Sequence, residues 1–230
     1  MSVSHSPSLD VETRSHRAAP LEPFSNPHRH GFYARFGKRA FDLFISLLAL
    51  IVLSPVLLAI AVLVKLTSAG PIFYRQNRVG RDARIFQIVK FRSMMVDADR
   101  HGRGITVAGD ERVTRAGRVL RETKLDELPQ LWNVVKGDMS FVGPRPEIPS
   151  YVALYTREQL GVLSVAPGIT DIASIRYRHE EKVLERSSNP DQFYRRVILP
   201  HKLSLNLQYI EQMSFSLDLK LIAQTLRSIF

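Results

Sequence analysis

The stretch Lys124–Gln130, with the sequence Lys-Leu-Asp-Glu-Leu-Pro-Gln, places the adjacent carboxylates Asp126 and Glu127 before an apolar run. Pro129 is poorly tolerated inside a helix but accepted in its first turn, and Gly137 behind the run is typical of a helix end. The stretch therefore predicts a short helix with Asp126 at or near its N-cap. Two interpretations of Asp126 stay open at this point: it only caps the helix, or it carries chemistry.

Free N–H groups and the positive end of the dipole at a helix start favour an ionised carboxylate, and they also favour a phosphate group beside it. Lys and Arg number 32 against 22 acidic residues, giving a net charge of +10. Anionic partners are therefore expected: nucleic acid, lipid headgroups or phosphorylated substrates. With 230 residues and 45% hydrophobic composition, the chain can bury one domain-sized core. The absence of cysteine excludes disulfides, thiolate zinc sites and cysteine nucleophiles.

Residues 1–34 are rich in Ser, Pro, His and Arg and have no sustained hydrophobic period, which predicts a disordered N-terminal tail. The segment Leu43–Val64 carries no charge and is long enough to span a bilayer as a straight helix. Pro55 interrupts it after Ser54, and a proline there removes the amide that would bond the carbonyl of Ile51. A sharp bend is therefore expected at this place.

The bend divides the apolar segment into the arms Phe41–Leu53 and Val56–Leu66. Each arm would reach only about 20 Å at 1.5 Å per residue, which is short of the roughly 30 Å bilayer core. Both flanks are basic, and the positive-inside rule favours a hairpin that enters and leaves on one face. A proline-kinked single crossing is the alternative. The flanking cations are Arg35, Lys38 and Arg39 before the segment, and Lys65, Arg75, Arg78, Arg81 and Arg84 after it.

Beyond Gly70-Pro71, the sequence predicts two strands, Ile72–Arg75 and Arg84–Arg92, around a turn at Asn77–Arg81. The cations of this hairpin form either a solvated face or a surface against lipid headgroups, and its position after the apolar segment favours the headgroups. A polar loop is expected over residues 97–115, followed by a helix from about Thr114 to Lys124 that carries Arg121. Arg121 is either a surface residue or a partner for phosphate.

The residues after the short helix that ends at Gly137 predict a stiff loop followed by short elements. Pro144 and Pro146 fix the backbone on either side of Arg145, which suits bidentate phosphate contact as well as an exposed turn. The sequence then predicts a helix over residues 149–163, a strand over Ile172–Tyr177 and a charged helix or loop over Glu180–Arg186. The chain ends in apolar periodic segments from Leu199, the last of which fits an amphipathic helix. The apolar face of that helix could either pack in the protein core or dock on a membrane surface.

Over residues 35–230 the sequence resembles the bacterial sugar transferase family, the monotopic polyprenyl-phosphate phosphoglycosyl transferases. The number and order of the motifs carry this resemblance, since any one of them alone would be weak. The motifs are Lys38-Arg39-Ala-Phe-Asp42, Ser54-Pro55, Phe73-Tyr-Arg75-Gln-Asn-Arg78-Val-Gly80, Lys90-Phe-Arg92-Ser-Met94, Leu125-Asp126-Glu127-Leu-Pro129-Gln130-Leu-Trp132-Asn133, Gly137-Asp138-Met-Ser140, Gly143-Pro144-Arg145-Pro146 and Pro167-Gly168-Ile-Thr170.

The resemblance implies a mixed α/β, mainly helical fold with interfacial amphipathic helices. It implies that residues 35–70 form a re-entrant membrane hairpin broken at Ser54-Pro55, and that residues 71–230 form a catalytic domain on the cytoplasmic face of the bacterial inner membrane. It also implies a nucleotide-sugar donor, with uridine as the expected base, a polyprenyl (undecaprenyl) phosphate acceptor and contact with the phospholipid bilayer. A homodimer is a further expectation, and nucleic acid is not an expected partner because an aromatic-rich RNA-binding motif is lacking.

The resemblance implies a reaction in which the protein holds the sugar phosphate covalently between donor and acceptor. Asp126 is the implied nucleophile, and Glu127 has a supporting acid–base or positioning role. Asp126 would also lie near the cofactor Mg²⁺. Attack on the donor would release a nucleoside monophosphate, and the lipid phosphate would then take the sugar phosphate in the first membrane step of glycan or exopolysaccharide assembly. The implied substrate-binding residues are Lys90, Arg92, Arg121, Pro144, Arg145 and Pro146.

Two positions depart from the family pattern. Asp171-Ile-Ala-Ser174 replaces the commoner Gly-Trp-Ala-Gln, which predicts a different sugar pocket, and Asn206 replaces an aspartate of many members. Two rival functions are a membrane-anchored basic adaptor and a glycosyl transferase that moves a bare sugar. The adaptor explains the charge and the hairpin but gives no reason for Asp126-Glu127 in the same chain as Pro144-Arg145-Pro146.

Overall fold

The computed structural model describes residues 33–96, 98 and 109–229. The predicted tail, residues 1–34, lies outside this range except for Tyr33 and Ala34, which begin a helical turn, η2 (Tyr33–Gly37). Most of the predicted loop over 97–115 also lies outside it. The longer helices are α1 (Lys38–Val52), α2 (Ser54–Thr67), α3 (Arg115–Glu122), α4 (Gln130–Lys136), α9 (Leu199–Gln212) and α10 (Phe215–Ile229).

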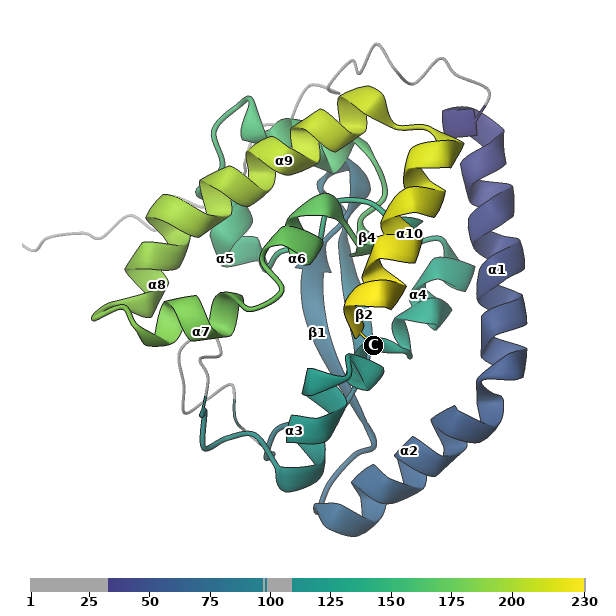
Figure 1. Cartoon of the computed structure of the whole chain (residues 1–230), viewed down its shortest axis with the longest axis vertical. Helices are drawn as coiled ribbons and strands as arrows, with labels where there is room; N and C mark the ends of the chain where they lie inside the picture. The colour runs from purple at the N-terminus through teal and green to yellow at the C-terminus, as the bar shows by residue number, and fades with distance from the viewer. Residues whose placement is uncertain (1–32, 97, 99–108, 230) are drawn as a thin grey trace, which may run out of the picture.

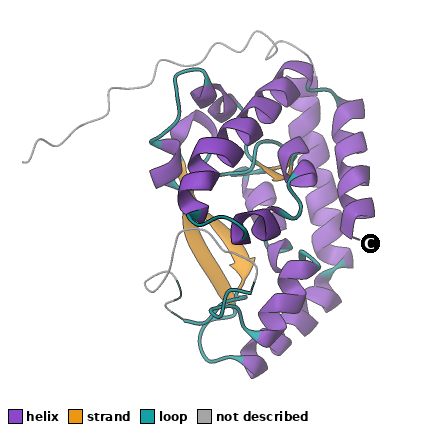
Figure 2. Ribbon diagram, turned by 60° about the vertical axis from the view of Figure 1, so that its left-hand side comes forward, coloured by secondary structure: helices purple, strands orange, loops and turns teal. Residues whose placement is uncertain are grey.

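The remaining elements are short. They are β1 (Phe73–Val79), η3 (Arg81–Ala83), β2 (Ile85–Phe91), η4 (Leu125–Glu127), β3 (Ser140–Val142), α5 (Pro149–Val152), η5 (Gln159–Ser164), β4 (Gly168–Thr170), α6 (Ile172–Arg176), α7 (Glu180–Glu185), α8 (Pro190–Phe193) and η6 (Tyr194–Ile198). Figure 2 shows the β1–β2 ribbon along one side of the helices, with the short β3–β4 pair set among them. The predicted mixed, mainly helical fold is confirmed.

Helices α1 and α2 form a bent pair along one edge of the molecule (Figure 1), and the angle between them is 63°. Pro55 cannot donate to the carbonyl of Ile51, and the hydroxyl of Ser54 bonds that carbonyl instead, at 2.8 Å. The predicted bend at Ser54-Pro55 is therefore confirmed. Among the described residues no single helix is long and apolar enough to cross a membrane, whereas this bent pair has the required length and composition.

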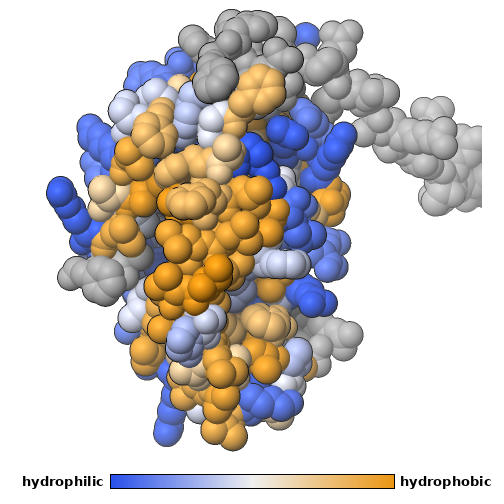
Figure 3. All heavy atoms as spheres, turned by 90° about the vertical axis from the view of Figure 1, so that its right-hand side faces the viewer, coloured by the Kyte–Doolittle hydropathy of each residue, from blue (hydrophilic) through white to orange (hydrophobic). Residues whose placement is uncertain are grey.

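The outer face of the bent pair is apolar. Figure 3 shows it as a continuous hydrophobic area on the side of the molecule that α1 and α2 occupy. Such a large exposed patch marks an interaction surface for lipid or protein rather than an ordinary solvated face. Its exposed side chains include Phe44, Leu47, Leu48, Ile51, Val52, Leu58, Val62, Leu63 and Leu66.

Buried polar contacts fix the start of α1 to the C-terminal helices. Asp218 of α10, which is 1% exposed, accepts hydrogen bonds from Lys38 Nζ at 2.5 Å and from the hydroxyl of Tyr209 on α9 at 2.7 Å. The hydroxyl of Tyr33 donates to the same carboxylate at 2.5 Å. One turn further along α1, Asp42 Oδ1 accepts the amide of Phe141 on β3 at 3.2 Å. The bent pair is thus attached to the rest of the chain through satisfied buried charges.

Strands β1 and β2 pair antiparallel from Phe73 opposite Phe91 to Val79 opposite Ile85. The hairpin is confirmed, but its turn lies later than the predicted Asn77–Arg81. The amide of Gly80 bonds the carbonyl of Arg84 at 2.8 Å, and Asp82 and Ala83 take positive φ angles inside the turn. Burial of Val79 keeps the end of β1 paired and moves the turn beyond it.

Two predictions for the C-terminal half are wrong. The helix predicted over residues 149–163 is interrupted, because the side chains and amides of Thr156 and Gln159 bond each other reciprocally and start the separate turn η5. The strand predicted over Ile172–Tyr177 is the helix α6, which Asp171 caps: its Oδ1 accepts the amide of Ser174 at 2.6 Å.

The other C-terminal predictions hold. The helix α7 occupies the charged segment, and α10 is the last apolar segment. Leu221 of α10 lies in the main core, whereas Phe215, Leu219 and Leu226 of the same helix are exposed. One side of α10 therefore packs in the core, and apolar side chains on the rest of its surface stay exposed. The main buried core is Val142, Tyr151, Val162, Leu184, Tyr194, Ile198, Leu199, Leu203, Tyr209, Ile210 and Leu221.

Helix α3 starts where predicted, with Thr114 as its N-cap, and it lies directly on the residues after β2. The hydroxyl oxygen of Thr114 accepts the amide of Gly117 at 2.9 Å, and the amide of Thr114 bonds the carbonyl of Ser93 at 3.0 Å. A Cβ at Gly117 would lie 1.9 Å from that same carbonyl oxygen. The helix can approach the chain this closely only with glycine at this position.

This contact predicts that Gly117→Ala destabilises the protein. In an ordinary helix interior the exchange stabilises by about 0.5–1 kcal/mol, because alanine loses less backbone entropy than glycine. Here the overlap with backbone should instead destabilise by about 1–3 kcal/mol or more. Thermal unfolding of the purified protein measures this effect, with Ala116→Gly as the control for the ordinary helix term. A Gly117→Ala midpoint at or above that of the parent protein would contradict the close approach.

Candidate active site

The two adjacent carboxylates lie in a tight turn rather than at a helix start. Lys124 takes a left-handed conformation with φ 58°, Leu125–Glu127 form the 3-10 turn η4, and α4 begins only at Gln130 with Pro129 as its N-cap. Asp126 is therefore near the N-cap, as predicted, but does not occupy it: it lies three positions before Pro129, because 3-10 hydrogen bonds continue through Leu128 before the α-helix starts. The predicted helix end is confirmed, since Gly137 takes φ 92°.

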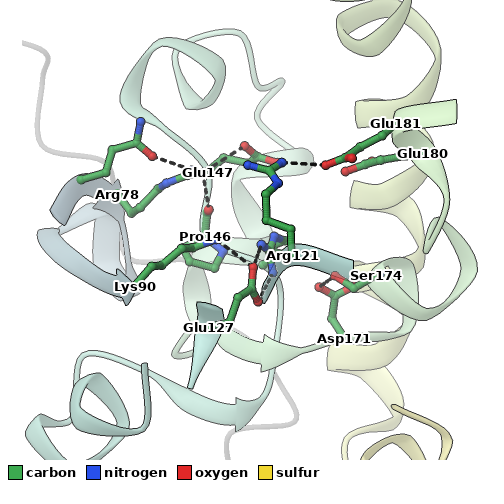
Figure 4. Close-up of polar contacts among 12 residues, drawn as sticks. Arg78, Lys90, Arg121, Glu127, Pro146, Glu147, Asp171, Ser174, Glu180 and Glu181 are labelled. Carbon is green, nitrogen blue, oxygen red and sulfur yellow. Dashed lines mark hydrogen bonds and ion pairs between the residues drawn. The ribbon is translucent and has the colours of Figure 1, made fainter. Parts of the chain in front are cut away.

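Glu127 is held by two cations from distant parts of the chain (Figure 4). Its Oε1 accepts from Lys90 Nζ of β2 at 2.7 Å and from Arg145 Nη2 at 2.5 Å, and its Oε2 accepts from Arg145 Nη1 at 3.1 Å. Burial opposes ionisation of Glu127, but Arg145 and Lys90 hold its pKa well below the ordinary value. Burial lowers the pKa of Lys90, against the attraction of Glu127, and Glu127 raises the pKa of Arg145.

Asp126 has a different environment from its neighbour. Asp126 is 6% exposed, and within the described chain its carboxylate makes neither a hydrogen bond nor an ion pair. Burial raises the pKa of Asp126 to about 6, and the charge of Lys90 acts against that rise. The structure therefore separates the two carboxylates: Glu127 is fixed by cations, and Asp126 keeps its oxygens available to a ligand.

Apolar and polar contacts hold the turn in this position. Leu125 and Leu128, on either side of the carboxylates, pack against the cluster that contains Ile60 and Val64 of α2. On the other side, Asn133 bonds the free edge of β2: its Nδ2 donates to the carbonyl of Gln87 at 2.7 Å and its Oδ1 accepts the amide of Val89 at 3.0 Å. Lys90, the next residue of β2, is thereby kept at the distance that Glu127 requires.

The loop of Arg145 is fixed through the two prolines beside it. The carbonyl of Pro144 accepts the amide of Gly168 at 3.0 Å, and the carbonyl of Pro146 accepts Arg78 Nη1 at 3.0 Å. Arg78 also pairs with Glu147 at 3.6 Å, and burial lowers the pKa of Arg78 despite that partner. Pro144 and Pro146 therefore act through their backbone, and Arg145 supplies the charged group that faces Glu127.

The remaining candidate residues lie at different distances from this centre. Arg121 of α3 donates to Glu181 of α7 at 2.7 Å (Figure 4), and its charge acts against the burial that raises the pKa of Asp126, so Arg121 lies at the edge of the site. Arg92 lies apart from it, because its Nη2 donates to the carbonyl and the hydroxyl of Ser68, both at 2.7 Å. Arg92 thus supports the end of α2 and does not face Glu127.

Two contributors to the site were missed in the sequence. Asn133 could have been noticed as a polar residue inside an apolar run, where it is fully buried. Glu147, which receives a hydrogen bond from the hydroxyl of Tyr194 at 2.5 Å, had no comparable signal in its own neighbourhood. Its partners Arg78 and Tyr194 come together only through the fold.

The side chains of the site could bind a metal ion only together with oxygens of a bound substrate or water. Among the described residues no group of three or more His, Cys, Asp or Glu side chains converges on a point. Mg²⁺ is commonly bound by one or two carboxylates together with substrate phosphates and water. Asp126 fits that arrangement, since its oxygens are not engaged by cationic side chains as those of Glu127 are.

Comparison with known proteins matches this chain to one family. The family model described as bacterial sugar transferase matches residues 33–230. A UDP-N-acetylgalactosamine-undecaprenyl-phosphate N-acetylgalactosaminephosphotransferase of Aeromonas hydrophila is 39% identical over 84% of this chain and 44% of its own length. A UDP-glucose:undecaprenyl-phosphate glucose-1-phosphate transferase of Klebsiella pneumoniae is 38% identical over 94% of this chain and 45% of its own length.

A third relative is closer in size to this chain. The uncharacterized sugar transferase EpsL of Bacillus subtilis is 35% identical over 84% of this chain and 86% of its own length. By contrast, the chain spans less than half the length of the Aeromonas and Klebsiella relatives. The match of the family model over residues 33–230, which include the bent helix pair and the Asp126–Glu127 turn, shows that the chain belongs to the bacterial sugar transferase family.

Proposed function

We propose that the protein transfers a sugar phosphate from a nucleotide sugar, with UDP as the expected nucleotide, to undecaprenyl phosphate. The observation that carries the proposal is the contrast between the two carboxylates: Glu127 is bound by Lys90 and Arg145, and Asp126 beside it is buried without such partners in the described chain. The names of the relatives support the same activity, since the two longer ones are called undecaprenyl-phosphate sugar phosphotransferases.

In the proposed first step, one carboxylate oxygen of Asp126 attacks the phosphorus that carries the sugar. The bond from this phosphorus to the bridging oxygen of the diphosphate breaks, and a nucleoside monophosphate leaves with the bond electrons. The sugar phosphate is then held as an acyl phosphate on Asp126. In the second step, an oxygen of the lipid phosphate attacks the same phosphorus, which restores the Asp126 carboxylate and gives a polyprenyl diphosphate sugar.

The cations around Glu127 suit this chemistry because negative charge develops on phosphoryl oxygens in both steps. Lys90 and Arg145 are already oriented by Glu127, so little reorganisation is needed when phosphate arrives. Arg121, held at the edge of the site by Glu181, adds a third positive group. When bound, Mg²⁺ would neutralise charge on the diphosphate, and Asp126 is the residue that would hold it.

The bent pair α1–α2 is proposed to be a re-entrant hairpin that holds the site at the cytoplasmic face of the inner membrane. Its apolar outer face and basic flanks support this topology. The carboxylate turn packs directly on α2 through Leu125 and Leu128, which would bring Asp126 to the level of lipid phosphates. The expected homodimer stays a prediction.

The nucleotide released separates this function from its rivals. Incubation with a panel of nucleotide sugars, polyprenyl phosphate and Mg²⁺ should yield nucleoside monophosphate. Nucleoside diphosphate would instead indicate transfer of a bare sugar, and no release would favour the membrane-anchored adaptor. The panel also identifies the sugar, for which Asp171 and Ser174 are the residues that depart from the usual family pattern.

The first prediction of this mechanism concerns the attachment site. With a labelled nucleotide sugar and no lipid acceptor, the parent protein should accumulate an adduct that peptide mapping locates on Asp126. Asp126→Asn keeps the shape but removes the nucleophile, so both half-reactions should fail while the protein stays folded. Glu127→Gln should still form the adduct, but more slowly, because it no longer balances Lys90 and Arg145. An adduct on Glu127, or native turnover by Asp126→Asn, would rule out the assignment.

A second prediction concerns the planar fork of Arg145. Arg145→Lys keeps the positive charge but cannot make two parallel contacts with a carboxylate or a phosphate. We expect a substantial loss of transfer activity with little change in the thermal unfolding midpoint. Arg118→Lys, on the exposed face of α3, is the matched control and should be near parent activity. Near-normal kinetics of a folded Arg145→Lys protein would show that the bidentate contact is not needed.

A third prediction tests the topology. Reporters placed before Lys38 and after Gly70 should both report the cytoplasm, because a re-entrant hairpin returns to the face it entered. Replacing Ser54 by Leu and Pro55 by Ala should restore the missing helical amide and remove the Ser54 hydroxyl from the carbonyl of Ile51, which favours a straight spanning helix. A periplasmic signal from either reporter in the parent protein would refute re-entry.

A further inference from the structure

The helix α4 presents an aromatic residue to the outside beside the bent pair. Trp132, the single tryptophan of the chain, is 55% exposed, whereas its neighbours Leu131 and Asn133 are buried. Lys136 follows four positions later and is also exposed, so the two side chains lie on the same face of the helix. A large indole with this exposure is not explained by packing within the described chain.

The exposure of Trp132 can be explained by the position of α4 next to the apolar face of the bent pair. α4 lies alongside α1 (Figure 1), and Arg39 of α1 donates to the carbonyls of Val134 and Val135 at 2.5 and 2.8 Å. The helix that carries the exposed indole therefore lies next to a helix whose outer face is apolar and whose first turn is basic. Tryptophan concentrates at the boundary between headgroups and acyl chains, since its ring is apolar and its N–H can bond polar groups.

From these contacts we propose that Trp132 is an interfacial anchor that inserts at the headgroup boundary of the bilayer and sets the depth of the adjacent Asp126 turn. The inference rests on the membrane association proposed above. The occupant of this face is lipid, because the exposed Arg39 at the start of α1 and the net charge of +10 complement anionic headgroups, whereas the exposed Lys136 is already paired with Asp138 at 2.8 Å. Asp126 and Trp132 belong to the consecutive turns η4 and α4, so the depth of one fixes the depth of the other.

Because the chain has one tryptophan, its intrinsic fluorescence reports this position alone. The full protein, reconstituted in vesicles of phosphatidylcholine and anionic phosphatidylglycerol, should show strong quenching by lipids brominated near the headgroup end of the acyl chain. Deeply brominated lipids should quench it less, and aqueous acrylamide only weakly. The matched control is Trp132→Phe combined with Leu154→Trp, since Leu154 is 51% exposed and follows α5, on the side of the molecule away from α1.

The relocated tryptophan should be quenched by acrylamide and hardly by brominated lipid. If the parent protein sediments with the vesicles but Trp132 is quenched by lipid no more than the tryptophan at position 154, the anchor is refuted and the proposed function is unaffected. If the protein does not sediment with the vesicles, both the anchor and the membrane topology are refuted. Stronger quenching by deep than by shallow bromines would also exclude an interfacial position.

Discussion

The site depends on the partly buried ionic group formed by Glu127, Lys90 and Arg145. Lys90 precedes Glu127 by 37 residues and Arg145 follows it by 18, so the contact joins β2, the carboxylate turn and the proline-flanked loop. Removing one partner of a buried ion pair leaves the other charge uncompensated, at about 3–5 kcal/mol. Each of the three groups therefore fixes the position of the other two, and the charges that are proposed to bind phosphate are oriented before a substrate is present.

The bent helix pair is joined to this centre by contacts of different kinds. Ile60 and Val64 of α2 pack with the leucines on either side of the carboxylates, so the turn rests on the pair itself. Arg92, which directly follows β2, donates to the carbonyl of Ser68 at the end of α2, where the helix dipole favours a cation. Lys38 at the start of α1 reaches Asp218 of α10. The start of α1 and the second half of α2 are thus attached to the rest of the chain, and a shift of α2 would move Asp126.

Features that depend on a few neighbouring residues could be predicted from the sequence. The bend at Ser54-Pro55, the cap at Thr114 and the helix end at Gly137 follow from the missing amide of proline, a side-chain acceptor and the positive φ of glycine. Predictions failed where a local polar group overrode the apolar pattern, as Asp171 did when it started α6. The partners Lys38 and Asp218 are 180 residues apart, so only the assembled fold could reveal them.

The same limit explains why the roles of Asp126 and Glu127 were assigned from the sequence only through the family resemblance. Adjacent residues share their sequence context, and either carboxylate could have been the one paired with cations. In the fold, Arg145 and Lys90 lower the pKa of Glu127, whereas burial raises the pKa of Asp126 to about 6. Environments that separate two neighbouring carboxyl groups in this way commonly divide their chemical roles. A carboxylate engaged by three hydrogen bonds has few electron pairs to offer to phosphorus, and this argues for Asp126 as the attacking group.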